Sequence, residues 1–410
     1  MSEWIETELK NLTVKIGSGA TPRGGQEAYK TEGISLIRSQ NILDFSFSTN
    51  GLAFIDDEQA RQLQNVEIQE KDVLINITGD SVARVCMVPA ETLPARVNQH
   101  VAILRADSKK LDPDYLLYYL LNPVIKRHLL RLSSDGATRN ALTKSNLEEL
   151  IISAPKDIIK QREIAEKIKL LDSKISLLRQ HNETLEELAQ TLFKRWFVEF
   201  EFPDKNGKPY KSSGGEMIDS ELGEIPEGWR VGKLSEIMLN HDNKRIPLSS
   251  NERLNRKGKY PYHGATSIMD YIDDFLFDGR YVLLGEDGSV VNDEGLPILQ
   301  FVDGKFWVNN HAHVLEGKGV FSTNYLYLLL RKKNINHIVT GAVQLKINQG
   351  NLNGISVLIG KNDTHDKFNQ LINPLFNQYF LNKNEIQSLT KLRDTLLPKL
   401  MSGELNIQSK

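Results

Sequence analysis

The sequence predicts an α+β chain in which two similar mixed modules alternate with two long antiparallel helices, as a pseudo-two-fold internal repeat. Two observations carry this prediction. Three short segments of the first half recur in the same order in the second half, and each half then continues into a long stretch with heptad spacing. The length of 410 residues also exceeds that of one ordinary domain.

The repeated segments carry the fold prediction. They pair residues 97–104 with 308–315, residues 114–120 with 324–330, and residues 136–147 with 341–352. The first pair is typical of a strand after a polar turn, and the second of an apolar helix capped by Asp114 or Asn324. The third pair aligns without a gap. The loops between the segments differ, as expected for one scaffold that carries two different recognition surfaces.

Apolar residues after Pro155 recur in alternating steps of four and three, which predicts a helix from near Asp157 to Phe200, about 60 Å long. Asn182 falls at an a position, where it either fixes the register or is solvated. The second helix has a weaker middle, and Pro374 should kink it or delay its regular part. The predicted helix–helix interface comprises Ile164, Ile168, Leu171, Ile175, Leu178, Asn182, Leu185, Leu192, Leu389, Leu392 and Leu396.

These patterns divide the chain into five parts. Residues 1–156 form the first module, 157–202 the central helix, 203–225 a turn-rich linker, 226–362 the second module, and 363–410 the C-terminal helix.

Composition excludes several classes of protein. The formal net charge of -2 gives no support to generic polyanion binding, so a nucleic-acid site must be local. The first residues lack the features of a signal peptide, and no apolar run is long enough to span a membrane. We therefore expect a cytoplasmic protein with no membrane partner. The single cysteine, Cys86, cannot form an internal disulfide and is expected to be buried.

Motifs for catalysis are missing. The sequence has no phosphate-binding P-loop, and residues 373–376 depart from the amino-methyltransferase signature that they superficially resemble. His311 and His313 lack further Cys or His companions, so structural histidines are favoured over a metal site. Pro203-Asp204 lacks the downstream acidic and lysine residues of a nuclease. We expect no catalytic residue, no metal and no enzyme activity in this chain by itself.

Candidate DNA contacts fall in three places. The densest basic cluster is predicted to neutralise phosphates, the polar run after the strand Ile34–Ile37 to contact bases, and the third repeated segment to contribute further contacts. Solvated loops and a polar turn are the alternatives. The candidates are Lys244, Arg245, Arg253, Arg256, Lys257 and Lys259 in the cluster, Arg38, Ser39, Gln40 and Asn41 in the run, and Arg139, Lys144, Gln344 and Lys346 in the repeat.

Three motifs resemble the specificity (S) subunits of type I restriction-modification systems. Residues 161–165 with 182–197 are similar to their central conserved region, and residues 223–229 to the opening of their second target-recognition domain. Residues 389–405, which include Leu-Pro-Lys-Leu-Met-Ser-Gly-Glu-Leu, resemble their C-terminal conserved region, and this last motif is highly specific. The resemblance covers the entire chain.

The resemblance implies two target-recognition domains, each of which reads one half of a bipartite, asymmetric site in double-stranded DNA. The antiparallel helices would act as a spacer and bind two methyltransferase (M) subunits, which bring S-adenosylmethionine and methylate adenine. Motor-nuclease (R) subunits would bring ATP and Mg. No base-contacting residue transfers by motif, because the recognition domains vary so widely.

Two other interpretations remain. The chain could serve a related modification system in which one fused methyltransferase-nuclease pairs with a similar specificity chain. It could also be a coiled-coil scaffold that never touches DNA, although the divergent loops of the two modules argue against this.

Overall fold

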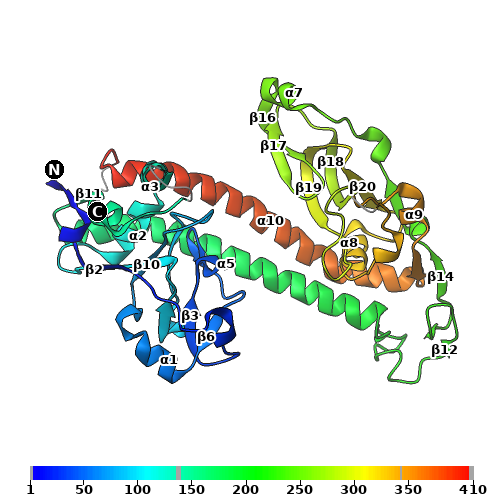
Figure 1. Ribbon diagram of the computed structural model, residues 1–410. Helices are drawn as coiled ribbons and strands as arrows, with labels where there is room; N and C mark the ends of the chain where they lie inside the picture. The colour runs from blue at the N-terminus through cyan, green and yellow to red at the C-terminus, as the bar shows by residue number, and fades with distance from the viewer. Residues whose placement is uncertain (1–2, 135–139, 342–343, 406–410) are drawn as a thin grey trace. The chain divides into compact units, whose positions relative to one another are not determined.

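The computed structural model describes residues 3–134, 140–341 and 344–405 (Figure 1). The chain forms two compact units, Met1–Leu178 with Glu385–Lys410 and Arg179–Asn384. Each unit holds one module together with one segment of each long helix.

Both predicted long helices are present. Helix α5 spans Ile158–Phe197 and helix α10 spans Asn362–Met401, each with 40 residues. The first helix is thereby confirmed. Helix α10 runs through Pro374, so the expected delay of its regular part is wrong. None of the helices within the described residues combines the length and apolar character needed to cross a membrane.

The first module contains two sheets and two antiparallel strand pairs. One sheet has the order β2-β10-β7-β8 and the other the order β6-β3-β9, while β1 pairs with β11 and β4 with β5. The strand bounds are β1 Trp4–Glu8, β2 Thr13–Ser18, β3 Ile34–Ile37, β4 Ile42–Leu43, β5 Ser46–Phe47, β6 Ala53–Ile55, β7 Val73–Asn76, β8 Val85–Met87, β9 Ala95–Val97, β10 Val101–Ala106 and β11 Ile151–Pro155. The α-helices are α1 Asp57–Gln62, α2 Pro113–Leu121, α3 Pro123–Ser134 and α4 Lys144–Glu148.

The second module is built on one larger sheet, with the order β15-β20-β18-β19-β16-β17, and β14 pairs with β21. Figure 1 shows α7 at the end of this sheet formed by β16 and β17. The strand bounds are β12 Met217–Ile218, β13 Ile225–Pro226, β14 Arg230–Lys233, β15 Met238–Asn240, β16 Lys257–His263, β17 Ile268–Ile272, β18 Phe277–Gly285, β19 Leu299–Val308, β20 Ala312–Gly317 and β21 Ser356–Ile359. The α-helices are α6 Leu234–Ile237, α7 Ser250–Asn255, α8 Thr323–Arg331 and α9 Gln349–Asn353.

The modules share one strand order. In the first, β10 lies antiparallel between β2 and β7, and in the second, β20 lies antiparallel between β15 and β18. Each module also has one parallel pair, β3 with β9 and β16 with β19, which enters the repeated Val-Asn-x-His turn. The strands predicted from the repeat are thus confirmed at β10 and β20, and the predicted strand Ile34–Ile37 is confirmed as β3.

The helix caps differ from prediction by two residues. Asp112 caps α2 by accepting a hydrogen bond from the Tyr115 N–H, and Ser322 caps α8 by accepting one from the Tyr325 N–H. Asp114 and Asn324 instead lie inside the helices. The helix starts earlier in the first module because Pro113 fits the first helical position, where no N–H is needed.

Within the first unit, the start of α5 packs against the end of α10. Ile164 and Ile168 share a core with Leu397 and Leu400, and Asp172 pairs with the buried Arg393 at 3.0 Å. Ile175 and Leu178 are buried as well, whereas Leu171, Leu389 and Leu396 are half-buried. The prediction for Leu392 is wrong: its side chain is 45% exposed, because the neighbouring Arg393 turns inward to reach Asp172.

Within the second unit, the end of α5 packs against the start of α10, again antiparallel. Trp196 lies against Phe368 with ring centroids 5.5 Å apart, while the earlier Asn182 meets the later Asn382. Asn182 is buried, and its amide oxygen accepts a hydrogen bond of 2.8 Å from Asn382 while its amide nitrogen donates to the Tyr379 carbonyl at 3.2 Å. Leu185 and Leu192 are half-buried. A buried, fully bonded Asn pair of this kind favours one register.

Each module has its own apolar core. The first centres on α2, β7, β10 and the start of α5, and the second on α8, β18, β20 and the end of α5. Cys86 is buried, and burial raises the pKa of its thiol to about 12, so it stays an unreactive thiol at neutral pH.

Candidate nucleic-acid interface

Three chain segments meet at one end of the central sheet in each module, and we call this meeting point the junction. In the first module the junction comprises residues 77–79, 98–100 and 140–142, and in the second residues 286–288, 309–311 and 345–347. It includes the first and third of the repeated segments, and its remaining segment was not recognised as a repeat from sequence.

The backbone hydrogen bonds of the two junctions correspond one to one. Gly79 N–H donates to the Asn140 carbonyl at 3.0 Å, and Gly288 N–H donates to the Leu345 carbonyl at 2.9 Å. Both glycines have positive φ, 76° and 81°, which glycine adopts without strain. The other backbone bonds repeat likewise, from Leu142 to Ile77, Ile347 to Glu286, Ile77 to His100 and Glu286 to His311. One scaffold is therefore built twice.

A histidine occupies the same position in each junction. The backbone N–H of His100 donates to Asn98 Oδ1 at 3.1 Å, and that of His311 donates to Asn309 Oδ1 at 2.9 Å. Asn98 and Asn309 are both buried, so each fixes the backbone of its turn from the interior of the module. The ring Nδ1 of His100 lies 2.7 Å from Thr78 Oγ1, and that of His311 lies 2.7 Å from Asp287 Oδ1.

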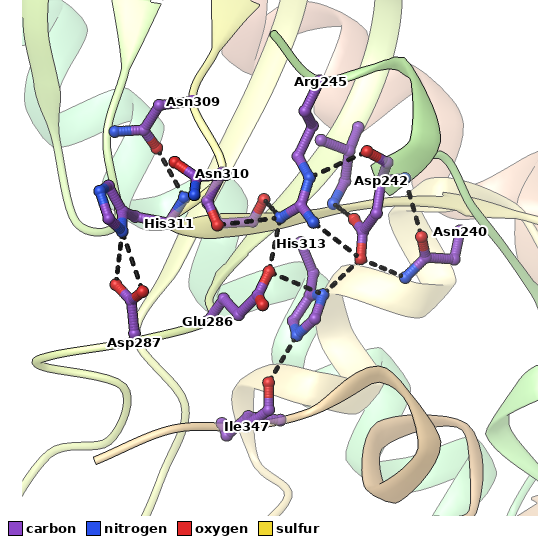
Figure 2. A network of polar contacts seen from close by, with 12 residues as sticks. Asn240, Asp242, Arg245, Glu286, Asp287, Asn309, Asn310, His311, His313 and Ile347 are labelled. Carbon is purple, nitrogen blue, oxygen red and sulfur yellow. Dashed lines mark hydrogen bonds and ion pairs between the residues drawn. The ribbon is translucent and has the colours of Figure 1, made fainter. Parts of the chain in front are cut away.

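Charged side chains lie beneath the junction of the second module (Figure 2). Arg245 is at their centre: its Nη1 donates to Glu286 at 2.7 Å and to the Ala312 carbonyl at 2.8 Å, and its Nη2 lies 3.5 Å from Asp242. His313 is buried between Asp242, at 2.6 Å from its Nδ1, and the Ile347 carbonyl, at 2.8 Å from its Nε2. This network connects all three segments of the junction.

The electrostatics of the network are balanced internally. Burial by itself would raise the pKa of Asp242, but the hydrogen bonds from His313 and the Val314 N–H, with the charge of Arg245, hold that pKa below its ordinary value. Asp242, Glu286 and His313 offer ligand atoms within 4.8 Å of one another, as a metal site would. The guanidinium of Arg245 already contacts both carboxylates, so an internal cation fills the role of the ion.

The first junction has a neutral counterpart. Ile77 stands where the second has Glu286, and Ala102 stands where the second has His313. Strand β2 of the first module corresponds to β15 of the second, which leads to Asp242. On β2, Ser18 pairs with Ala102. Conserved backbone bonds thus support an apolar interior in one module and an ionic interior in the other.

The predicted basic cluster is largely neutralised within the fold. The Arg245 side chain is 12% exposed, and its guanidinium is bound to Glu286, Asp242 and the Ala312 carbonyl, which argues against the predicted phosphate contact. Asp270 pairs with Lys257 at 2.6 Å and with Arg253 at 3.6 Å, and Asp273 pairs with Arg256 at 3.0 Å. Among the described residues, we find no ion pair for the exposed Lys244 and Lys259.

The polar run of the first module braces its own loop. Asn41 is fully buried, accepts the Arg38 N–H at 3.0 Å and donates to the Ser48 carbonyl at 2.9 Å, so its amide is not available to a base. Arg38 and Gln40 both donate to the Gly51 carbonyl, at 2.5 and 3.1 Å. Ser39 is half-buried and its carbonyl accepts from Asn76 at 2.9 Å.

The candidates of the third repeated segment lie at or near the junctions. Lys346 is exposed, sits in the second junction and pairs with Glu286 at 3.4 Å, and the exposed Gln344 precedes it. Lys144 lies in α4, just after the first junction, and pairs with Glu148 at 3.3 Å. Arg139 lies outside the described residues.

Sequence reasoning missed Thr78, Asp287 and the role of His100 and His311 as paired junction residues. A signal was available, because Thr78-Gly79 and Asp287-Gly288 are both polar residues followed by glycine after an apolar strand. This two-residue pattern is too short to be recognised as a repeat until the strands before it are aligned.

Comparison with known proteins places these features in a family. Residues 1–187 and 226–391 match the family described as type I restriction modification DNA specificity domain. The MjaIX specificity subunit of Methanocaldococcus jannaschii is 28% identical over 99% of this chain and 94% of its own length. A putative specificity subunit of Haemophilus influenzae is 34% identical over 31% of this chain and 32% of its own. The crystal structure of the S subunit from M. genitalium has the same fold, with a TM-score of 0.62, 16% identity and coverage of 100% and 97%.

Proposed function

Because this chain belongs to the family of type I restriction-modification DNA specificity subunits, we propose that each of its two modules reads one half of a bipartite, asymmetric DNA site. The chain itself performs no chemistry. The repeated junction supports this function: the same backbone bonds hold side chains that differ between the modules, Thr78 against Asp287 and Ala141 against Lys346. A shared scaffold that carries different side chains at equivalent positions is what two readers of unlike sequences require.

In this proposal the long helices separate the modules as a coiled-coil spacer and dock two methyltransferase subunits. Large apolar side chains on α5 remain uncovered in each unit: Leu170 and Leu177 are 67% and 59% exposed in the first, and Leu188 is 46% exposed in the second. Exposed leucines along a helix are typical of a surface that another protein covers. S-adenosylmethionine, ATP and Mg would be held by the methyltransferase and motor-nuclease subunits.

The test is a reconstitution. The purified chain should neither methylate nor cut DNA, and addition of its cognate methyltransferase subunit should produce adenine methylation at one bipartite motif. Sequencing of methylated adenines in DNA from a host without other adenine methylation would read the motif. Methyl transfer by the chain alone, or a complex whose methylation has no sequence motif, would contradict the proposal. The second result would favour a scaffold that does not read DNA.

A further inference from the structure

From the two junctions we infer that His100 and His311 contact the DNA directly, one in each half-site, and that Thr78 and Asp287 set which hydrogen bonds each ring offers. This inference rests on the proposed function and adds to it the residues that discriminate bases. It does not depend on the basic cluster, whose arginines are engaged within the fold.

The first step is the fixed position of each ring. The backbone of each histidine is held on both sides: its N–H by Asn98 or Asn309, and its carbonyl by the N–H of Ile77 or Glu286, at 2.9 and 2.8 Å. The ring is then held through Nδ1. A side chain fixed at the backbone and at one ring atom loses little further freedom when it binds a ligand, which favours specific recognition.

The second step is exposure. The side chain of His311 is 47% exposed and that of His100 is half-buried, although each follows a buried strand and a buried asparagine. In Figure 2 the His311 ring turns its second nitrogen away from Asp287. Within the described residues we find no hydrogen bond for that Nε2, and the Nε2 of His100 has only a contact of 3.4 Å with the exposed Gln99.

The third step concerns the exposed side chains next to each ring. The exposed Gln99 precedes His100 and the exposed Asn310 precedes His311, and the exposed Asn140 and Lys346 lie on the segment across the junction. Amide groups pair with adenine and basic groups with guanine or phosphate. Each histidine therefore stands among side chains suited to base edges and backbone, and these companions differ between modules.

The partners give the two rings different chemistry. The carboxylate of Asp287 only accepts hydrogen bonds, so Nδ1 of His311 carries a proton and the exposed Nε2 accepts when the ring is neutral or donates when it is charged. The hydroxyl of Thr78 both donates and accepts and carries no charge, so it leaves the tautomer of His100 open. The same residue would thus offer different hydrogen bonds to the two half-sites.

The experiment uses the full chain, co-expressed with its cognate methyltransferase subunit in a host that lacks other adenine methylation. Three variants are compared with the natural chain: His100→Ala, His311→Ala, and Asp287→Thr, which gives the second ring the partner of the first. The readout is the base preference at every position of both half-sites, from sequencing of methylated adenines. Affinity for duplexes carrying the natural motif is measured with the purified complexes.

His311→Ala should weaken binding about tenfold and relax the preference at one position of the second half-site only. His100→Ala should do the same in the first half-site, and Asp287→Thr should alter base preference in the second half-site without abolishing binding. The control is His241→Ala, which removes a histidine paired to Glu316 at 2.7 Å in the second module but outside the junction; it should leave both half-sites unchanged. Thermal unfolding of each variant separates loss of contact from loss of fold.

Unchanged base preference and affinity in both histidine variants would overturn the inference. So would a variant that has the same unfolding temperature as the natural chain but loses base preference equally at both half-sites. Those results leave the proposed function standing, because the natural complex would still have a motif. A natural complex without any motif would instead end both.

Discussion

The two junctions have the same backbone and opposite interiors. Beneath His100 the first module places Ile77 and Ala102, whereas beneath His311 the second places Glu286 and His313, joined by Arg245 and Asp242. The strand pairing and turns survive this exchange because they depend on backbone hydrogen bonds and on two glycines with positive φ. Side chains at the junction are therefore free to differ, which is the property that a pair of independent readers needs.

The comparison also shows what charge does in a junction. Both turns are held by backbone hydrogen bonds and by a buried asparagine, but the second module adds a network of ion pairs and charged hydrogen bonds whose members depend on one another.

The largest effect should come from exchange of a whole module. Replacement of residues 2–155 by the matching domain of a relative should change the first half-site completely and leave the second intact, because each junction is held by bonds within its own module. Sequencing of methylated adenines in cells that express the hybrid with its methyltransferase subunit would show this. Alteration of both half-sites would mean that the modules do not read DNA independently.

The next largest effect should come from Arg245. Arg245→Ala removes the guanidinium that Asp242 and Glu286 share, and breaking such a partly buried ion pair costs about 3–5 kcal/mol of unfolding free energy. Urea unfolding followed by tryptophan fluorescence would report it, since Trp196, Trp229 and Trp307 all lie in the second unit.

The matched control is Arg230→Ala, which removes an exposed arginine paired to Glu236 and should change stability little. Equal effects of the two variants would show that the ionic interior contributes no more than a surface pair. An Arg245→Ala variant more stable than the natural chain would show that the ionic interior lowers the unfolding free energy of the second module.

Much of this difference could not be predicted from sequence. The heptad spacing gave the ends of α5 within three residues, and the repeated Val-Asn-x-His segment gave β10 and β20, because both patterns are local. Arg245 looked like a phosphate contact because its carboxylate partner Glu286, just after β18, is remote in the sequence. Asn382, the partner of Asn182, is likewise remote in sequence. Asn41 was predicted to contact a base because its actual hydrogen-bond acceptors, the Ser48 and Asn50 carbonyls, lie in the loop that follows it.

Gln161 and His365 are each the fourth residue of a long helix, and only the histidine should make stability depend on pH. Gln161, near the start of α5, donates to the Lys110 and Pro155 carbonyls and accepts the Asp112 N–H. His365, near the start of α10, is buried among Phe197, Phe321 and Tyr325, and no partner is found for its ring nitrogens within the described residues. Burial lowers the pKa of His365 to about 4.

The sign of the effect follows from proton uptake. Between pH 4 and about 6.5 the unfolded chain binds a proton at His365 that the folded chain refuses, so stability rises with pH through that window and is lost as pH falls. The loss should approach about 3 kcal/mol near pH 4. His365→Leu should flatten this part of the profile, and His337→Gln, at an exposed histidine, should not. Parallel profiles for the natural chain and His365→Leu would contradict the assignment.

The smallest effect should distinguish two lysines of one hairpin. Lys259 is exposed without an ion pair among the described residues, so its positive charge is available to a phosphate, whereas Lys257 is held by Asp270 at 2.6 Å. Lys259→Ala should lower the slope of log affinity against log salt by about 0.9 and weaken binding equally for all sequences, since a phosphate contact carries no base information. Lys257→Ala should change the slope less, because its charge is already compensated. Binding isotherms of the complex at several salt concentrations would give both slopes. Two unchanged slopes would place the hairpin away from the DNA, and a larger change for Lys257 would mean that DNA displaces Asp270 from its lysine.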